Sequence, residues 1–374
     1  MNFNNQKNQE FRILDFPNSV YIILKEGYRK QLFNDLYRKN GGKMATARKL
    51  GIHLASIRTY ENGFIKKADI ISPSSIPIRI LKKIIEPHNQ IELEKNILSI
   101  SSYNGLKVYN PILPIKESQG LYAIISHMLG DGSASKGKTP YYANTCKILR
   151  GQFIKDLQLF GKVSNYEKIP NTTPVIYFPK VITDILSYIF NITFTYPDRI
   201  PQELFKARKE YKISFLRALF DDEGTITTNL AICINNKNFL KQIKNLLKAL
   251  DIETGKITKT PYNTKKGIKY KTSFNILKRS YMEFQKKINF SHPDKIRKLG
   301  FALKTANRQQ RTRDPTFIEE KIIEILDVKP STTMDLANKL FFTMSGILPH
   351  LSRLYKEKIL IKKGYKNKII WDLA

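Results

Sequence analysis

Two apolar stretches of the chain repeat one pattern of hydrophobic and small positions, LYAIISHMLGDGS (residues 121–133) and FLRALFDDEGT (residues 215–225). In the first, the small residues Ser126 and Gly130 lie four positions apart, and both stretches end in an acid followed by glycine. Residues at i and i+4 share one face of a helix, and small side chains there let two helices approach closely. A glycine after the acid is typical of a helix C-terminus. We predict two helices packed side by side, each presenting one carboxylate in its last turn.

The segments that follow the two stretches also repeat. After the first come the β-prone runs YYANTCKI and PVIYF, with helices predicted over residues 152–160 and 180–190. After the second come TITTNLAICI, GKITKT and KYKTSFNIL, with helices predicted over residues 238–250 and 279–288. The order helix, strands, helix, strands, helix thus occurs twice, which indicates a duplicated α+β core.

A shorter echo supports the duplication. Residues 196–200 read YPDRI and residues 292–296 read HPDKI, so both carry P-D-[RK]-I at similar distances after the two acids. The echo puts Arg199 and Lys295 at equivalent positions.

The N-terminal sequence ATARKLGIHLASIRTYENG resembles a Cro/repressor-type helix-turn-helix, and we assign residues 1–70 to such a domain. Ala47, Gly51 and Ile57 occupy its alanine, turn-glycine and hydrophobic positions. The second helix, over residues 53–61, is then expected in the major groove. The side chains that it would expose are Ser56, Arg58 and Thr59. An ordinary helical hairpin with a glycine turn is the alternative.

Two further segments flank the core. Residues 71–116 contain SPSSIP and NPILP and indicate a linker with a short helix over residues 79–85. Residues 312–374 predict three short helices and a basic hairpin, an order that resembles a winged helix with residues 345–356 in the groove. The lysines that would contact phosphate there are Lys362, Lys363, Lys366 and Lys368. A protein-contact domain is the alternative.

Charge narrows the choice of partner. The chain carries 64 Lys and Arg against 32 Asp and Glu, a net charge of +32, and the excess is spread along the sequence. A basic surface favours a polyanion, usually nucleic acid, although biased codon usage is an alternative source of lysine. Within the core, the predicted phosphate contacts are Lys136, Lys138, Lys269 and Lys271.

The two motif acids, Asp131 and Glu223, suit DNA hydrolysis. Cutting a phosphodiester needs a nucleophilic water, charge relief at phosphorus and help for the leaving oxygen, and Mg²⁺ held by carboxylate and phosphate oxygens supplies all three. The alternative is that each acid merely ends a helix. Because the helix dipole disfavours a carboxylate at that end, its presence twice calls for a compensating cation. We predict Asp131 and Glu223 as metal ligands. Asp221 and Asp222 beside Glu223 are interpreted as solvated or structural, and support of the metal ligands is the alternative role for Asp222.

MLGDGS and FLRALFDDEG resemble the two motifs of single-chain LAGLIDADG homing endonucleases. The resemblance implies two pseudo-symmetric αββαββα halves, over residues 117–210 and 211–305, that form a saddle on double-stranded DNA. It implies that Asp131 and Glu223 bind Mg²⁺ or Mn²⁺ and that the chain acts as a monomer. It also implies a basic residue near the scissile phosphate in each half, for which the echo nominates Arg199 and Lys295. Arg199 departs from the lysine that is usual at this position. Arginine stays charged and does not readily perturb a water.

Three rival functions remain in view. The first is a phosphate-loop ATPase, because residues 132–139 fit the pattern GxxxxGK[ST]. That mechanism needs a strand before the loop and a helix opening at Lys138. A catalytically inactive regulator or an RNA maturase with the same fold is the second. An intein is the third, and we expect none, because the terminal residues of self-splicing are missing.

Other features exclude further classes. No run of about 18 apolar residues and no signal peptide are evident, and the five histidines have no zinc spacing. Cys146 and Cys233 form no metal-type pair and indicate a reducing, cytoplasmic setting, with both side chains in the core.

Overall fold

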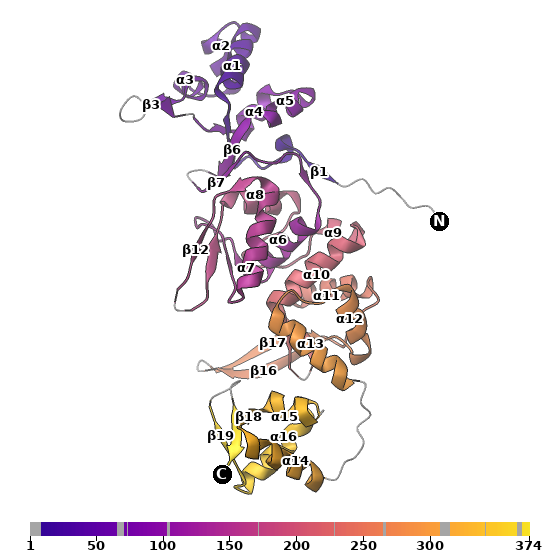
Figure 1. The fold of residues 1–374 in the computed structure, drawn as a ribbon. Helices are drawn as coiled ribbons and strands as arrows, with labels where there is room; N and C mark the ends of the chain where they lie inside the picture. Colours follow the sequence, from indigo (N-terminus) through magenta and orange to yellow (C-terminus); the bar gives the residue numbers. More distant parts are fainter. Residues whose placement is uncertain are drawn as a thin grey trace. The chain divides into compact units, whose positions relative to one another are not determined.

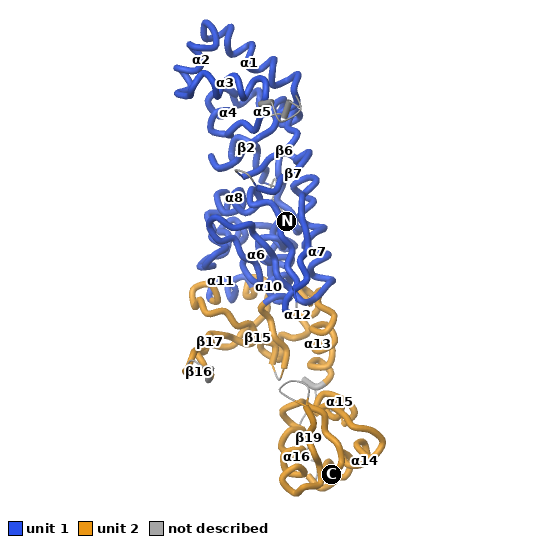
Figure 2. The backbone as a smooth tube through the Cα atoms, turned by 90° about the vertical axis from the view of Figure 1, so that its left-hand side faces the viewer, with its two compact units in different colours: residues 1–222, 241–246 blue, residues 223–240, 247–374 orange. Residues whose placement is uncertain are grey.

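The computed structural model describes residues 9–65, 71–72, 74–102, 105–170, 172–227, 229–264, 267–306, 315–340, 342–364 and 369–374. The chain divides into two compact units, which Figure 2 colours separately. Unit 1 comprises residues 1–222 and 241–246, and unit 2 comprises residues 223–240 and 247–374.

A five-stranded antiparallel sheet lies near the start of unit 1, in the order β11-β7-β6-β2-β5. Its strands are β2 (Val20–Leu24), β5 (Ile76–Pro77), β6 (Ile97–Ser102), β7 (Lys107–Tyr109) and β11 (Lys162–Val163). The adjoining helices are α4 (Ile78–Ile84) and α5 (Gln90–Lys95), with the 3-10 turns η1 (Ile13–Asp15) and η2 (Pro87–Asn89). Two short pairs complete the region, β1 (Glu10–Phe11) with β8 (Ile115–Lys116) and β3 (Phe64–Ile65) with β4 (Ile71–Ser72).

The linker predicted over residues 71–116 is wrong, because these residues supply much of that sheet. Its prolines mark element boundaries: Pro77 ends β5 and is also the N-cap of α4. Pairing with β2, far back in the chain, satisfies the backbone of β6. Local composition does not report such long-range pairing.

Three helices precede this region, α1 (Glu26–Asn40), α2 (Lys43–Leu50) and α3 (Leu54–Asn62). Gly51 joins α2 to α3 in the left-handed conformation (φ 67°), which glycine adopts without strain. Phe33 and Ile57 are fully buried between the helices. The two helices of the predicted hairpin therefore form with their turn at the expected glycine, and their DNA-binding role remains a prediction.

The first half of the core is a motif helix, a four-stranded antiparallel sheet and covering helices (Figure 1). The elements are α6 (Gln119–Leu129), β9 (Gly132–Ser133), β10 (Tyr141–Ala143), α7 (Lys147–Leu157), η3 (Gln158–Phe160), β12 (Tyr166–Lys168), β13 (Val175–Tyr177), α8 (Lys180–Ile189) and α9 (Gln202–Lys206). Tyr142 of β10 packs against Phe153 of α7, with ring centroids 4.6 Å apart, so α7 covers the inner face of the sheet.

The second half has the same strand order. Its elements are α10 (Lys209–Glu223), β14 (Gly224–Ile226), β15 (Leu230–Cys233), α11 (Lys237–Lys248), β16 (Thr258–Thr264), β17 (Gly267–Asn275), η4 (Lys278–Ser280), α12 (Tyr281–Lys287) and α13 (Pro293–Ala306). The order β14-β15-β17-β16 matches β9-β10-β13-β12 position for position. The predicted duplication is confirmed, although YYANTCKI is strand only over its first residues and β12 was not predicted.

The C-terminal elements are α14 (Pro315–Val328), β18 (Ser331–Thr332), α15 (Thr333–Leu340), α16 (Met344–Lys356), β19 (Leu360–Lys363) and β20 (Ile370–Leu373). The three strands form a sheet in the order β18-β20-β19. Ile322, Leu336, Ile347 and Leu351 form its fully buried core, and Trp371 packs against them. None of the helices in the described part of the chain is long and apolar enough to cross a membrane.

Candidate catalytic site

The helices α6 and α10 pack directly against each other in unit 1, as predicted. The buried Ser126 hydroxyl donates a hydrogen bond to the backbone carbonyl of Phe215, at 2.7 Å. At the start of α6, the Ser214 hydroxyl of α10 donates to the carbonyl of Gln119, at 2.8 Å. A side chain reaches the backbone of the opposite helix only if the two backbones are close, and serine at the contact allows this.

Two glycines shape the end of α6. Gly130 is its C-cap, and a Cβ atom there would lie 3.0 Å from the Cβ of Asp222 on α10. A Cβ atom on Gly132 would lie 2.4 Å from the Cα of Met128, so β9 runs against the helix backbone. Gly132, the glycine after the motif acid, therefore lets β9 approach the backbone of α6, and the helix ends before this glycine.

This corrects the predicted position of one motif acid. Asp131 lies in the turn after α6 rather than in its last helical turn, whereas Glu223 is the last residue of α10. The helix-dipole argument thus applies to Glu223 alone.

The acid that faces α6 across the contact is Asp222, whose side chain is fully buried. His127 Nδ1 lies 2.8 Å from its Oδ2, and the Tyr142 hydroxyl donates to its Oδ1 at 2.8 Å. The Asn144 amide donates to the same Oδ1 at 3.2 Å. Burying a carboxylate is costly unless it is paired and hydrogen-bonded, and these three groups meet that need.

The protonation states support a buried ion pair. Burial lowers the pKa of His127, but the charge of Asp222 and the hydrogen bond to it raise that pKa more, and the net shift is upward. Burial and then the charge of Asp222 raise the pKa of Tyr142, so its hydroxyl stays protonated and donates the hydrogen bond to Asp222. The short contact and the raised pKa of His127 favour an ion pair between the two helix ends.

Asn144 connects this pair to the first motif acid. Its amide nitrogen lies 3.1 Å from Asp131 Oδ2 as well as within reach of Asp222, and its own oxygen accepts the backbone N–H of Cys146 at 2.8 Å. The carbonyl of Asp131 accepts the backbone N–H of Ala143, at 3.1 Å. The Asp131 carboxylate is thus oriented from β10 and the turn that follows it.

Sequence reasoning named Asp222 as a supporting neighbour but missed its partners. His127 has a visible signal, since it is the one residue within the apolar run 121–129 that can carry a positive charge. Tyr142 and Asn144 carry no comparable signal, because their role depends on β10 folding back beside α6.

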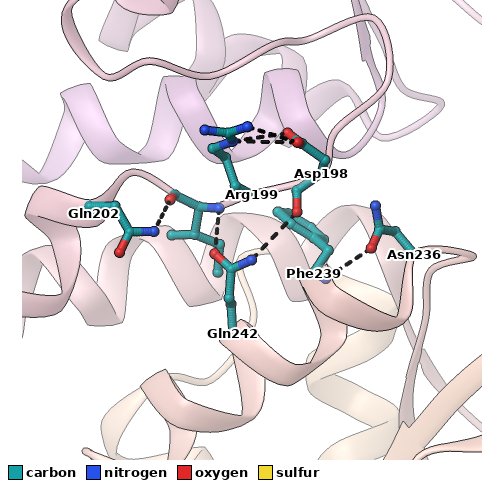
Figure 3. Close-up of polar contacts among 7 residues, drawn as sticks. Asp198, Arg199, Gln202, Asn236, Phe239 and Gln242 are labelled. Carbon is teal, nitrogen blue, oxygen red and sulfur yellow. Dashed lines mark hydrogen bonds and ion pairs between the residues drawn. The ribbon is translucent and has the colours of Figure 1, made fainter.

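Arg199 lies in the loop before α9, and Figure 3 shows its guanidinium against the carboxylate of the preceding residue. Arg199 Nη2 is 3.1 Å from Asp198 Oδ2, and both side chains are about half exposed. Gln242 holds this loop, accepting the N–H of Ile200 at 2.9 Å and donating to the carbonyl of Asp198 at 3.4 Å. Arg199 is therefore positioned as part of an ion pair.

Lys295 occupies the echoed position in different local structure. It lies in the first turn of α13, with its Nζ 5.9 Å from the ring centroid of Phe290, whereas Arg199 is in a loop. Arg199 belongs to unit 1 with Asp131, and Lys295 to unit 2 with Glu223. The four predicted catalytic residues thus divide evenly between the units.

The predicted DNA contacts are mostly at the surface. The exposed ones are Arg58, Lys136, Lys138, Lys269, Lys271, Lys362 and Lys363. Ser56 and Thr59 are half-buried, and the Thr59 hydroxyl donates to the carbonyl of Ala55 at 2.8 Å, so their contact with DNA remains a prediction. Lys366 and Lys368 lie outside the described residues.

The elements before and after residues 132–139 contradict the phosphate-loop alternative. A helix, α6, precedes Gly132, and a strand, β10, follows Thr139, which is the reverse of the arrangement that mechanism requires. The expectation of two core cysteines is also wrong, because the free thiols Cys146 and Cys233 are only half-buried.

Carboxylates, the residue type predicted for the metal site, suit a divalent ion whose remaining ligands come from phosphate and water. Among the described residues, no group of three or more His, Cys, Asp or Glu side chains is arranged to hold a metal. Mg²⁺ is commonly bound by one or two carboxylates together with phosphate oxygens and waters, so the roles of Asp131 and Glu223 as metal ligands stay a prediction.

The fold and the motif helices together define a class: a duplicated mixed helix and sheet core, each half built from one motif helix and a four-stranded antiparallel sheet. Residues 210–289 match the model of the LAGLIDADG-like domain. No curated protein matches the chain.

Several solved structures share parts of the fold at low identity. The homing endonuclease I-DmoI in complex with DNA and Ca is 16% identical, with a TM-score of 0.34 over 49% of this chain and 97% of that one. I-WcaI bound to its DNA recognition sequence is 16% identical, with a TM-score of 0.32 over 49% and 86%. Full-length DUF199/WhiA from Thermatoga maritima is 13% identical, with a TM-score of 0.36 over 64% and 90%.

Proposed function

We propose that this protein is a site-specific DNA endonuclease of the LAGLIDADG homing type, which hydrolyses both strands with divalent metal. The observation that carries the proposal is the direct pairing of α6 and α10, the helices that lead to Asp131 and Glu223. The LAGLIDADG-like match over residues 210–289 supports it independently.

Asp131 and Glu223 are the proposed metal ligands. A bound Mg²⁺ or Mn²⁺ ion supplies the activated water and the charge relief that phosphodiester hydrolysis needs. Asn144 fixes the orientation of the Asp131 carboxylate through the 3.1 Å hydrogen bond to Oδ2. The buried pair of His127 and Asp222 keeps the helix ends closed beside it.

The basic surface supplies the proposed DNA contacts. Lys136 and Lys138 follow the first motif, and Lys269 and Lys271 lie on β17 of the second half, all exposed. A net charge of +32 supports phosphate binding along an extended duplex. The α3 helix and the C-terminal helices and sheet are proposed to lengthen that contact, with Arg58, Lys362 and Lys363 at the DNA.

Arg199 and Lys295 are proposed to act near the scissile phosphates. Each is placed by the P-D-[RK]-I echo, and each carries a positive charge suited to phosphate. The ion pair of Arg199 with Asp198 requires the arginine to exchange or share that partner when phosphate arrives.

A catalytically inactive DNA-binding regulator or maturase is the second candidate. The pairing of Arg199 with Asp198 favours it, because a guanidinium already paired is less available to a reacting phosphate.

Cleavage of DNA from the gene's own locus tests the proposal. We expect plasmid carrying that flanking DNA to be cut in Mg²⁺, with short 3′ overhangs, and to stay intact in EDTA. Tight binding without a cut in any divalent metal would instead establish the regulator.

A further inference from the structure

A pocket of about 540 Å³ lies on the outer face of the first half's sheet, and its lining begins at Ser133, two residues after Asp131. Its lining includes Tyr141, Tyr166 and Tyr177, with Lys138 and Lys168 at its rim, and no Asp or Glu. A cavity of this size with aromatic walls and two cations suits a planar ligand that carries negative charge.

The tyrosines form a row that the sheet register imposes. Tyr141 and Tyr166 both pair with Tyr177 on β13, and Ser133 of β9 pairs with Tyr141. Directly paired residues point to the same face, so one row crosses all four strands on the side opposite the buried Tyr142.

The end of the row offers a stacking surface. The rings of Tyr166 and Tyr177 are stacked, with centroids 4.8 Å apart and planes 15° apart. Tyr166 lies on β12, the edge strand of the sheet (Figure 1), and its side chain is 49% exposed. A planar base placed on Tyr166 would extend this stack by one ring.

Lys138 and Lys168 lie beside the tyrosines, where they would contact the phosphate of a nucleotide whose base stacks on Tyr166. Lys168 is two residues beyond Tyr166 on the same strand and therefore on the same face. Lys138 approaches from the loop between β9 and β10 and lines a second pocket of about 460 Å³ on the other side of that loop. The two pockets share Lys138 and Thr139, and the second pocket continues past this loop to Lys180, which is ion-paired with Asp184.

We propose that this pocket binds an unpaired nucleotide of a DNA strand, with its base stacked on Tyr166 and its phosphates against Lys138 and Lys168. In duplex DNA both faces of each base are already stacked, so the site selects a nucleotide that is extruded, frayed or in a gap. The proposal rests on the proposed DNA function and adds a second, strand-selective contact to it.

Binding of three labelled probes at one salt concentration tests this: an intact duplex, the same duplex with a short gap in one strand, and the single strand alone. The wild-type protein is expected to bind the gapped duplex more tightly than the intact one. Because stacking on one aromatic ring is worth about 1–3 kcal/mol, Tyr166→Ala should weaken gapped-duplex and single-strand binding by roughly 5- to 150-fold. Its binding to intact duplex should stay within about twofold, below the smallest stacking effect expected.

Two variants separate stacking from other roles of the tyrosine. Tyr166→Phe keeps the ring and should bind as the wild-type protein does. Tyr270→Ala removes an exposed tyrosine that also lies beside a lysine, Lys259, but on β17 of the second sheet, and should change nothing. An equal loss in Tyr166→Phe and Tyr166→Ala, or an equal loss on intact and gapped duplex, would overturn the stacking site. Tighter binding of an RNA strand of the same sequence would overturn the assignment to DNA.

The outcome is separable from the proposed nuclease function. If Mg²⁺-dependent cleavage is present and the gapped duplex has no advantage, the pocket assignment fails and the nuclease remains. If the gap preference depends on Tyr166 while no divalent metal supports cleavage, the pocket stands and the nuclease fails.

Discussion

At the scale of single residues, Asp222 and Asn144 connect the end of α6 to α10 and to Asp131. Asp222 meets its partner His127 across 95 positions of sequence, so no local pattern reports the pair. The motif acids themselves were predictable, because an apolar run ending in acid and glycine is a local signal. Asn144, which bonds Asp131, was not, since it lies in the turn after β10.

Asn144 gives the first residue-scale prediction. Groups that orient a metal ligand typically contribute 10- to 100-fold to metal affinity or activity, so we expect Asn144→Ala to weaken Mn²⁺ binding by roughly this factor. Calorimetric titration of Mn²⁺ measures it. Asn165→Ala, which removes an amide hydrogen-bonded only to the nearby carbonyl of Val163 among its described contacts, is the control and should bind Mn²⁺ normally. Unchanged affinity in Asn144→Ala would show that Asp131 is oriented without it.

His127 gives the second, as a dependence of stability on pH. Its folded-state pKa is raised, so the stabilisation from its pair with Asp222 is complete below the unfolded pKa of about 6.5 and is lost as pH rises through the folded value. The groups whose charge favours the imidazolium are Asp222, Asp221 and Asp156. We expect the urea midpoint of the wild-type protein to fall as pH rises above about 6.5.

The control for this titration is His127→Asn, whose amide can donate to Asp222 but does not titrate. Its urea midpoint should change less over the same range. A wild-type midpoint that rises with pH relative to this variant would contradict a charged His127.

At the scale of elements, the sequence predicted the helices better than the strands. The motif helices and α8, α11 and α12 appear near their predicted positions because apolar periodicity is a local property. The five-stranded sheet of unit 1 was missed because its strands pair across distant segments, as β11 does with β7. The short β12 was missed because three residues carry too little pattern.

Glycine packing at the end of α6 gives the element-scale prediction. Gly132→Ala forces a Cβ atom to 2.4 Å from the backbone of Met128, so we expect a loss of about 1–3 kcal/mol or more in unfolding free energy. Gly151→Ala, within α7 where nothing lies within 4 Å of the added atom, should instead gain about 0.5–1 kcal/mol. Urea denaturation followed by circular dichroism compares them. Equal stability of the two variants would refute the tight contact.

At the scale of the whole molecule, a net charge of +32 and exposed lysines on both sheets point to a polyanion. Each phosphate neutralised by Lys or Arg releases counterions, so affinity falls with salt. If about six to ten phosphates are contacted, duplex affinity should drop about 10³- to 10⁵-fold between about 50 and 200 mM salt. Fluorescence anisotropy against salt concentration gives the slope, and a flat response would argue against DNA as the partner.

The central claim is that Glu223, with Asp131, holds the metal that cuts DNA. The most direct measurement is duplex binding and Mg²⁺-dependent cleavage by Glu223→Gln, side by side with Glu253→Gln, which changes an exposed acid on the same unit. We predict that Glu223→Gln binds duplex as the wild-type protein does and does not cut it, while Glu253→Gln both binds and cuts. Cleavage by Glu223→Gln at the wild-type rate would contradict the claim.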